Sequence, residues 1–221
     1  MDGLLLIKLL HLIAFVYWLG GDLGTFYASR FVTKEDLSSE ARSTALTIMM
    51  GCDQGPRFAM PLIFPLGFEL AVHMGYIDMA PIGVAIIWLV SIIWVATVIT
   101  LHFAHGKNFI PALTTFDFYL RICVVIALLS LSGYALATGT IILAAWTAYK
   151  IIVFALLVAC GLMIRIKLRP FMVAWGSLMT SGPTDAVNAA ISGSIAKARP
   201  YVWAIWIGLF VNAALGLHLI G

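Results

Sequence analysis

Histidines, lysines and carboxylates inside apolar segments are the residues of this chain that could carry chemistry. Lys8 and His11 lie in the first apolar segment, and Glu69 and His73 lie four residues apart in the second. A helix rises about 1.5 Å per residue, and on this basis His11 and His73 lie at similar depths in the membrane. Two imidazoles on separate helices at one level can ligate a haem iron axially. The spacing therefore predicts His11 and His73 as the metal ligands of a b-type haem.

Further side chains complete this predicted site. Trp18 lies on the same helical stripe as His11 and is expected to pack on the macrocycle. Arg30 is expected to hold a charge at the cytoplasmic end of that helix. Lys150 is the alternative to His73 as the second ligand. Otherwise it extends to the membrane interface or pairs with Glu69 or with a ligand carboxylate. Both histidines also have simpler explanations: the first could be a structural residue bonded to a backbone carbonyl, and the second could be solvated.

The elements that must position these residues are membrane-spanning helices. Hydrophobic residues make up 62% of the 221 residues and charged residues only 10%, whereas a soluble domain has roughly a quarter charged. A crossing needs about 20 apolar residues, and none of the apolar segments alternates as β-barrel strands do. We predict an all-α, polytopic bundle of six helices in one domain, residues 1–221. The predicted crossings are residues 3–30, 48–76, 81–103, 120–137, 141–165 and 201–220.

The positive charges predict the orientation. Nearly all of the 13 lysines and arginines fall in three connectors, at residues 30–47, 103–121 and 165–199. Because basic loops stay on the cytoplasmic side, we expect an inner-membrane protein with both termini outside. In the last of these connectors Thr184 resembles an N-cap, and an apolar stripe follows it, which predicts a short amphipathic helix on the cytoplasmic surface. The stripe consists of Val187, Ile191 and Ile195.

A second layer of charged residues lies towards the predicted cytoplasmic end. Asp22 and Arg57 have similar depths on the first two helices, so we expect them to form an ion pair that lowers the cost of burying both. Asp117 and Arg121 are four residues apart and are expected to pair locally.

The second apolar segment contains Pro56, Pro61 and Pro65. Each proline lacks an N–H group, so neighbouring helices or a ligand must satisfy the backbone carbonyls that lose a donor. We therefore expect this helix to be kinked and to lie inside the bundle. In transporters, broken helices aim their backbone dipoles at ions. The prolines therefore also favour a transporter or channel as an alternative function.

Two helices resemble those of a known family. Lys8-x-x-His11, Trp18 and the run Gly24-Thr25-Phe26-Tyr27-Ala28-Ser29-Arg30 resemble the first helix of the HemJ-type protoporphyrinogen oxidases and related CopD-like membrane proteins. Trp146-Thr147-x-x-Lys150 resembles a second helix of that family, and the whole pattern is similar to a family of uncharacterised bacterial integral membrane proteins. The resemblance implies that His11 is the haem-side histidine, that Lys150 is its partner lysine, and that the chain is an oxidoreductase.

Three function classes follow from these observations. The first is a membrane protein that binds haem b or a porphyrin and acts in electron transfer or tetrapyrrole chemistry with a redox partner. The second is the transporter or channel. The third is a non-catalytic subunit of a larger membrane complex or of a homo-oligomer, favoured by small residues that permit close helix contact. Topology already explains the net charge of +3, so it does not indicate a nucleic-acid partner.

Overall fold

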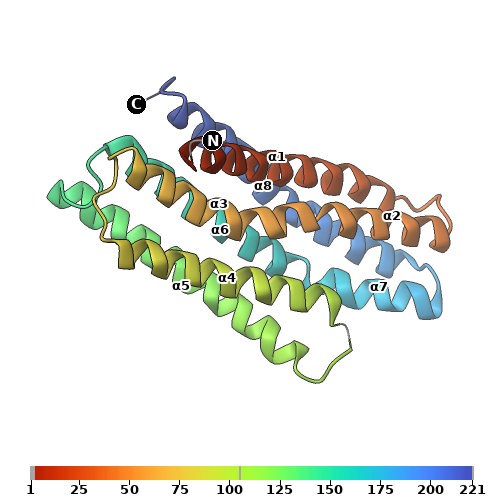
Figure 1. Ribbon diagram of the computed structural model, residues 1–221. Coiled ribbons are helices and arrows are strands. Elements are labelled where there is room, and N and C mark those ends of the chain that lie inside the picture. Colours follow the sequence, from red (N-terminus) through yellow and green to blue (C-terminus); the bar gives the residue numbers. More distant parts are fainter. Residues whose placement is uncertain (1–2, 105, 221) are drawn as a thin grey trace.

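The computed structural model describes residues 3–104 and 106–220, which form eight α-helices (Figure 1). The predicted all-α class is confirmed, and the described residues form no strand beyond an isolated bridge between Ile77 and Ile142. The helices are α1 (Gly3–Val32), α2 (Ser39–Cys52), α3 (Gln54–His73), α4 (Pro81–Phe103), α5 (Ile110–Thr138), α6 (Ala145–Lys167), α7 (Arg169–Ser181) and α8 (Asp185–Gly216).

Five helical stretches are long and apolar enough to cross a membrane, which makes this a multi-pass membrane protein. They are Gly3–Val32, Pro81–Phe103, Ile110–Thr138, Ala145–Ser181 and Asp185–Gly216. The predicted second crossing, residues 48–76, is not among them; it forms the end of α2 and all of α3. Figure 1 shows that α1 begins and α8 ends at the same end of the bundle, so the chain traverses the bundle an even number of times. We therefore count α3 as the sixth traverse, which is less apolar than the other five.

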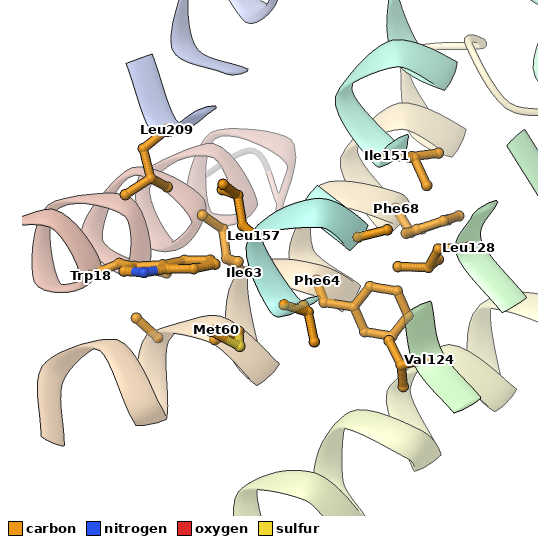
Figure 2. Close-up of a cluster of buried hydrophobic side chains, with 14 of the residues drawn as sticks. Trp18, Met60, Ile63, Phe64, Phe68, Val124, Leu128, Ile151, Leu157 and Leu209 are labelled. Atoms are coloured by element: carbon orange, nitrogen blue, oxygen red, sulfur yellow. The ribbon is translucent and has the colours of Figure 1, made fainter. Parts of the chain in front are cut away.

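The six traversing helices form a ring in which α1 contacts α3, α3 contacts α4, α4 contacts α5, α5 contacts α6, α6 contacts α8, and α8 returns to α1. The main core lies inside this ring, and α3 contributes most to it. Phe64 of α3 stacks on Phe154 of α6 with 5.8 Å between the ring centroids. Figure 2 shows Phe64 and Phe68 together with Val124 and Leu128 of α5. The predicted position of this helix inside the bundle is confirmed.

A neighbouring helix satisfies the backbone group that a proline frees in α3. Because Pro65 has no N–H, the carbonyl of Pro61 lacks its helical donor. The hydroxyl of Ser91, which is buried on α4, donates a hydrogen bond to this carbonyl at 2.5 Å. The helix remains continuous across both prolines, and the interruption in this part of the chain falls at Asp53, between α2 and α3.

A second core lies at the opposite end of the bundle from the chain ends, where α2, α7 and the start of α8 pack on the end of α1. Thr184 caps α8 by accepting a hydrogen bond from the Val187 N–H at 3.3 Å, as predicted. The predicted amphipathic stripe belongs to this core. It is the first part of α8, which runs on through Pro200 into the last crossing instead of forming a separate helix.

Arg42 of α2 connects three elements in this second core. Its Nε donates to the carbonyl of Val32 at 2.9 Å, and its Nη1 donates to Oδ1 of Asn188 at 2.8 Å. The side chain is almost completely buried, and this burial lowers the pKa of the guanidinium group from its ordinary value. Arg42 therefore ties the end of α1 to the start of α8 through α2.

At the end where the chain begins and finishes, the connectors without lysine or arginine join each other. The Asp78 N–H donates to the Ile141 carbonyl at 2.7 Å, and the Leu143 N–H donates to the Tyr76 carbonyl at 2.9 Å. The loop between α3 and α4 is thereby held against the loop between α5 and α6. Together they close one side of the region that holds the candidate site.

Candidate functional site

A cavity of about 600 Å³ lies at this end of the bundle, lined by α1, α3, α6, α8 and the residues that follow α3 and α8. Its volume is in the range of small-molecule and cofactor sites. Most of its wall is apolar and much of it is aromatic: Phe15, Phe64, Phe68, Tyr76, Trp146 and Phe154. Its ionisable groups among the described residues are Lys8, His11, Lys150 and His218, with no carboxylate. The cavity is thus an aromatic chamber with cationic groups.

His11 lies on the cavity wall where α1 packs against α3. A Cβ atom placed on Gly67 would lie 3.0 Å from Cε1 of the imidazole, so a side chain at this position would displace the ring. The Ile63 backbone interacts with the ring as a hydrogen-bonding group, although the buried Nδ1 atom forms no hydrogen bond of ordinary geometry to a described residue. The imidazole as a whole borders the cavity, and a histidine side chain in such a position can ligate an iron.

Lys150 projects from α6 into the same cavity. Its Nζ lies 5.7 Å from the ring centroid of Trp146, and a Cβ on Gly216 of α8 would lie 2.6 Å from that Nζ. The absence of a side chain at Gly216 therefore makes room for the ammonium group. The ion pairs among the described residues are Arg57–Asp53, Arg121–Asp117 and Arg165–Asp117. Neither Lys150 nor Lys8 is thus neutralised by a described carboxylate.

His73 and Glu69 lie outside the cavity. Glu69 accepts a hydrogen bond from Nε1 of Trp88 on α4 at 2.7 Å. It does not form the ion pair with Lys150 that the sequence left open. His73 is exposed, and its Nδ1 lies 2.8 Å from the Glu69 carbonyl oxygen of its own helix. The structure therefore does not bring His73 to His11.

His218 is the second imidazole on the cavity wall, a position that residue spacing does not indicate. It follows the end of α8 in a left-handed backbone conformation with φ of 55°. Its ring packs edge-on against Trp146 with 4.8 Å between centroids. His218 is exposed, as its depth near the end of the last helix implies, and nothing in the residue spacing indicates that it borders the cavity.

Trp18 and Arg30 also lie apart from the cavity. Trp18 is 1% exposed and packs edge-on against Phe154 at 6.0 Å, within the main core (Figure 2). Arg30 is exposed near the other end of α1, about 28 Å from His11 at the usual helical rise. Its guanidinium lies 5.5 Å from the ring centroid of Phe26. The described geometry thus gives Trp18 a packing contact and Arg30 a cation–π contact.

Several glycines of α1 and α3 allow these helices to approach their neighbours closely. A Cβ on Gly24 would lie 2.7 Å from Sγ of Cys52, and one on Gly55 would lie 2.7 Å from the Tyr17 carbonyl oxygen. These contacts bring α1 close to α2 and α3. Gly67 differs from them, because it faces His11.

The charged residues towards the predicted cytoplasmic end form different ion pairs from those that the sequence predicted. The expected pair between Asp22 and Arg57 is not formed, because Arg57 pairs with Asp53 one turn before it on the chain. The local pair of Asp117 and Arg121 is confirmed, with 3.0 Å between Oδ2 and Nε. Arg165 of α6, which the sequence did not indicate, joins this pair.

Fold and cavity together define a multi-pass α-helical membrane protein with an aromatic, cationic cavity at one end of its bundle. The described residues contain no group of three or more histidine, cysteine, aspartate or glutamate side chains able to hold a metal ion. Comparisons with protein-family models, curated proteins and solved structures found no match to this chain.

Proposed function

We propose that this protein binds a b-type haem or a related porphyrin in the cavity, with His11 as a ligand to the iron. The observation that carries the proposal is the imidazole of His11 on the wall of an aromatic cavity that two lysines also line. A tetrapyrrole is a flat apolar molecule with carboxylates at its edge. An aromatic chamber with unneutralised ammonium groups complements both of those properties.

Each side chain then has a defined task. His11 would hold the iron. Gly67 has no side chain that would displace this imidazole. Lys8 and Lys150 would bind the carboxylates, since they are not paired with described acidic groups. His218 replaces His73 as the candidate for a second ligand, because His218 borders the cavity.

Bound haem would supply electron transfer or tetrapyrrole redox chemistry, and the chain's contribution is to set its environment. A haem potential depends on the axial ligands, on nearby hydrogen bonds and on burial. The aromatic wall would surround the macrocycle with apolar groups, and the lysines would place positive charge beside its carboxylates. An oxidoreductase activity with a separate redox partner is consistent with this arrangement.

The test is the absorbance spectrum of the protein purified from cells supplied with a haem precursor. We expect a Soret band, and we expect His11→Ala to lose it. His73→Ala is the matched control, because it removes an imidazole outside the cavity and should leave the band unchanged. Equal bands in the wild type and His11→Ala would refute the assignment of the ligand.

The same preparation separates the other two function classes. A colourless protein that mediates flux in liposomes would support transport, and a colourless, inactive protein that co-purifies stoichiometrically with partners would support an accessory subunit. The prolines of α3 favoured transport because a carbonyl without a helical donor could bind an ion. Ser91 donates a hydrogen bond to the Pro61 carbonyl, which weakens this argument. We therefore favour haem or porphyrin binding.

A further inference from the structure

At the far end of the bundle from the cavity, one buried carboxylate is shared by two arginines. Asp117 of α5 has a fully buried side chain, and its Oδ2 accepts from Nε of Arg121 at 3.0 Å and from Nη1 of Arg165 at 2.6 Å. Arg121 is also buried, and its guanidinium lies 5.0 Å from the ring centroid of Trp94. Two positive groups thus share one negative group.

A third arginine lies beside these two. Arg57 and Arg165 both lie close enough to Arg121 to repel it, and Arg57 is paired with Asp53. Asp53 in turn lies close enough to the Asp22 carboxylate of α1 to interact with it. Positive groups at membrane depth are costly unless anions compensate them.

A pocket of about 540 Å³ adjoins this cluster between α2, α3, α4 and α6. Arg57, Arg165 and His102 line it, together with the polar side chains of Ser43 and Gln54. Arg57 and Arg165 have side-chain exposures of 36% and 27%, so their remaining N–H groups can reach a ligand. Deeper in the cluster, Nη2 of the buried Arg121 makes no hydrogen bond to any residue that the structure describes.

We propose that this inner pocket binds a phosphate group through Arg57 and Arg165. Guanidinium groups donate two parallel hydrogen bonds to phosphate oxygens, and this geometry favours phosphate over a spherical anion. Asp117 holds Arg165 in position, and the phosphate would lie beside the two partly exposed arginines that line the pocket. The phosphate belongs either to the headgroup of an anionic lipid in the predicted inner leaflet or to a soluble phosphate compound.

The first experiment measures binding of inorganic phosphate to the detergent-purified protein by calorimetry, with chloride at the same ionic strength as the reference. We expect Arg57→Gln to weaken binding about tenfold, the effect of losing one charge-assisted contact. Arg57 is partly exposed, so this variant should fold, and circular dichroism checks that it does. Lys167→Gln is the matched control, because it removes a charge at the same end of α6 outside the pocket.

The second experiment identifies the source of the phosphate. Native mass spectrometry of the protein in nanodiscs would compare phosphatidylglycerol with phosphatidylcholine, using the same variants. Retention of phosphatidylglycerol that Arg57→Gln reduces would support a lipid headgroup, and calorimetric binding without lipid retention would support a soluble compound. The proposal is overturned if neither probe binds, or if Lys167→Gln weakens binding as much as Arg57→Gln.

Discussion

Replacing Asp117 by asparagine tests whether the charge cluster is buried as the structure describes. The substitution keeps the size of the side chain and removes the negative charge that Arg121 and Arg165 share. Removing one partner of a buried ion pair costs about 3–5 kcal/mol, because the other charge stays buried without compensation. Arg165 is partly exposed and can turn towards solvent, whereas Arg121 cannot. Most of the expected loss therefore comes from Arg121.

The free energy of unfolding can be measured by titrating sodium dodecyl sulfate into mixed micelles and following helicity by circular dichroism. We expect Asp117→Asn to lower this free energy by about 3–5 kcal/mol. The double variant Asp117→Leu with Arg121→Met should lose less than Asp117→Asn, because it removes both charges together. A loss below about 1 kcal/mol in Asp117→Asn, the level of a surface pair, would refute the reasoning.

Three further predictions concern the cavity and α3. Lys150→Met should weaken haem binding about tenfold. It should leave the binding of haem dimethyl ester unchanged, because only free carboxylates pair with the ammonium group. Difference spectroscopy with both ligands measures the two affinities. Gly67→Val should abolish the Soret band, since its side chain would displace His11; Gly20→Val, where a Cβ meets nothing within 4 Å, is the control. Ser91→Ala should lower the free energy of unfolding by about 1–3 kcal/mol by leaving the Pro61 carbonyl unsatisfied; equal stability of this variant and the wild type in the micelle titration would contradict that role.

The sequence identified part of the candidate site and missed the rest for a definite reason. Depth along a helix follows from residue number, so the spacing of Lys8, His11 and Lys150 along their helices is enough to place them at one level. The direction of a side chain depends on how its helix is rotated against its neighbours. Rotation places His73 at the surface, and a loop after α8 places His218 on the cavity wall. Neither outcome has a signal in residue spacing.

The same distinction applies to the charges. The pair of Asp117 and Arg121 was predictable, because a separation of four residues brings two side chains together on any helix. Arg165 joins them from α6, 48 positions from Asp117 in the numbering, and this contact requires that α5 and α6 be neighbours in the ring. The expected pair of Asp22 and Arg57 was wrong, because Asp53 lies one turn from Arg57 on the same stretch of chain.

By itself, the sequence determined that this is an all-helical chain crossing a membrane several times, because long apolar stretches can satisfy their backbone groups only as helices in lipid. It also determined which ionisable residues lie at membrane depth. The tertiary structure decided which of them meet, since only the order and rotation of the helices in the ring bring α1, α3, α6 and α8 around one cavity. Contacts between distant segments depend on side-chain packing across helices, which no local pattern of residues encodes.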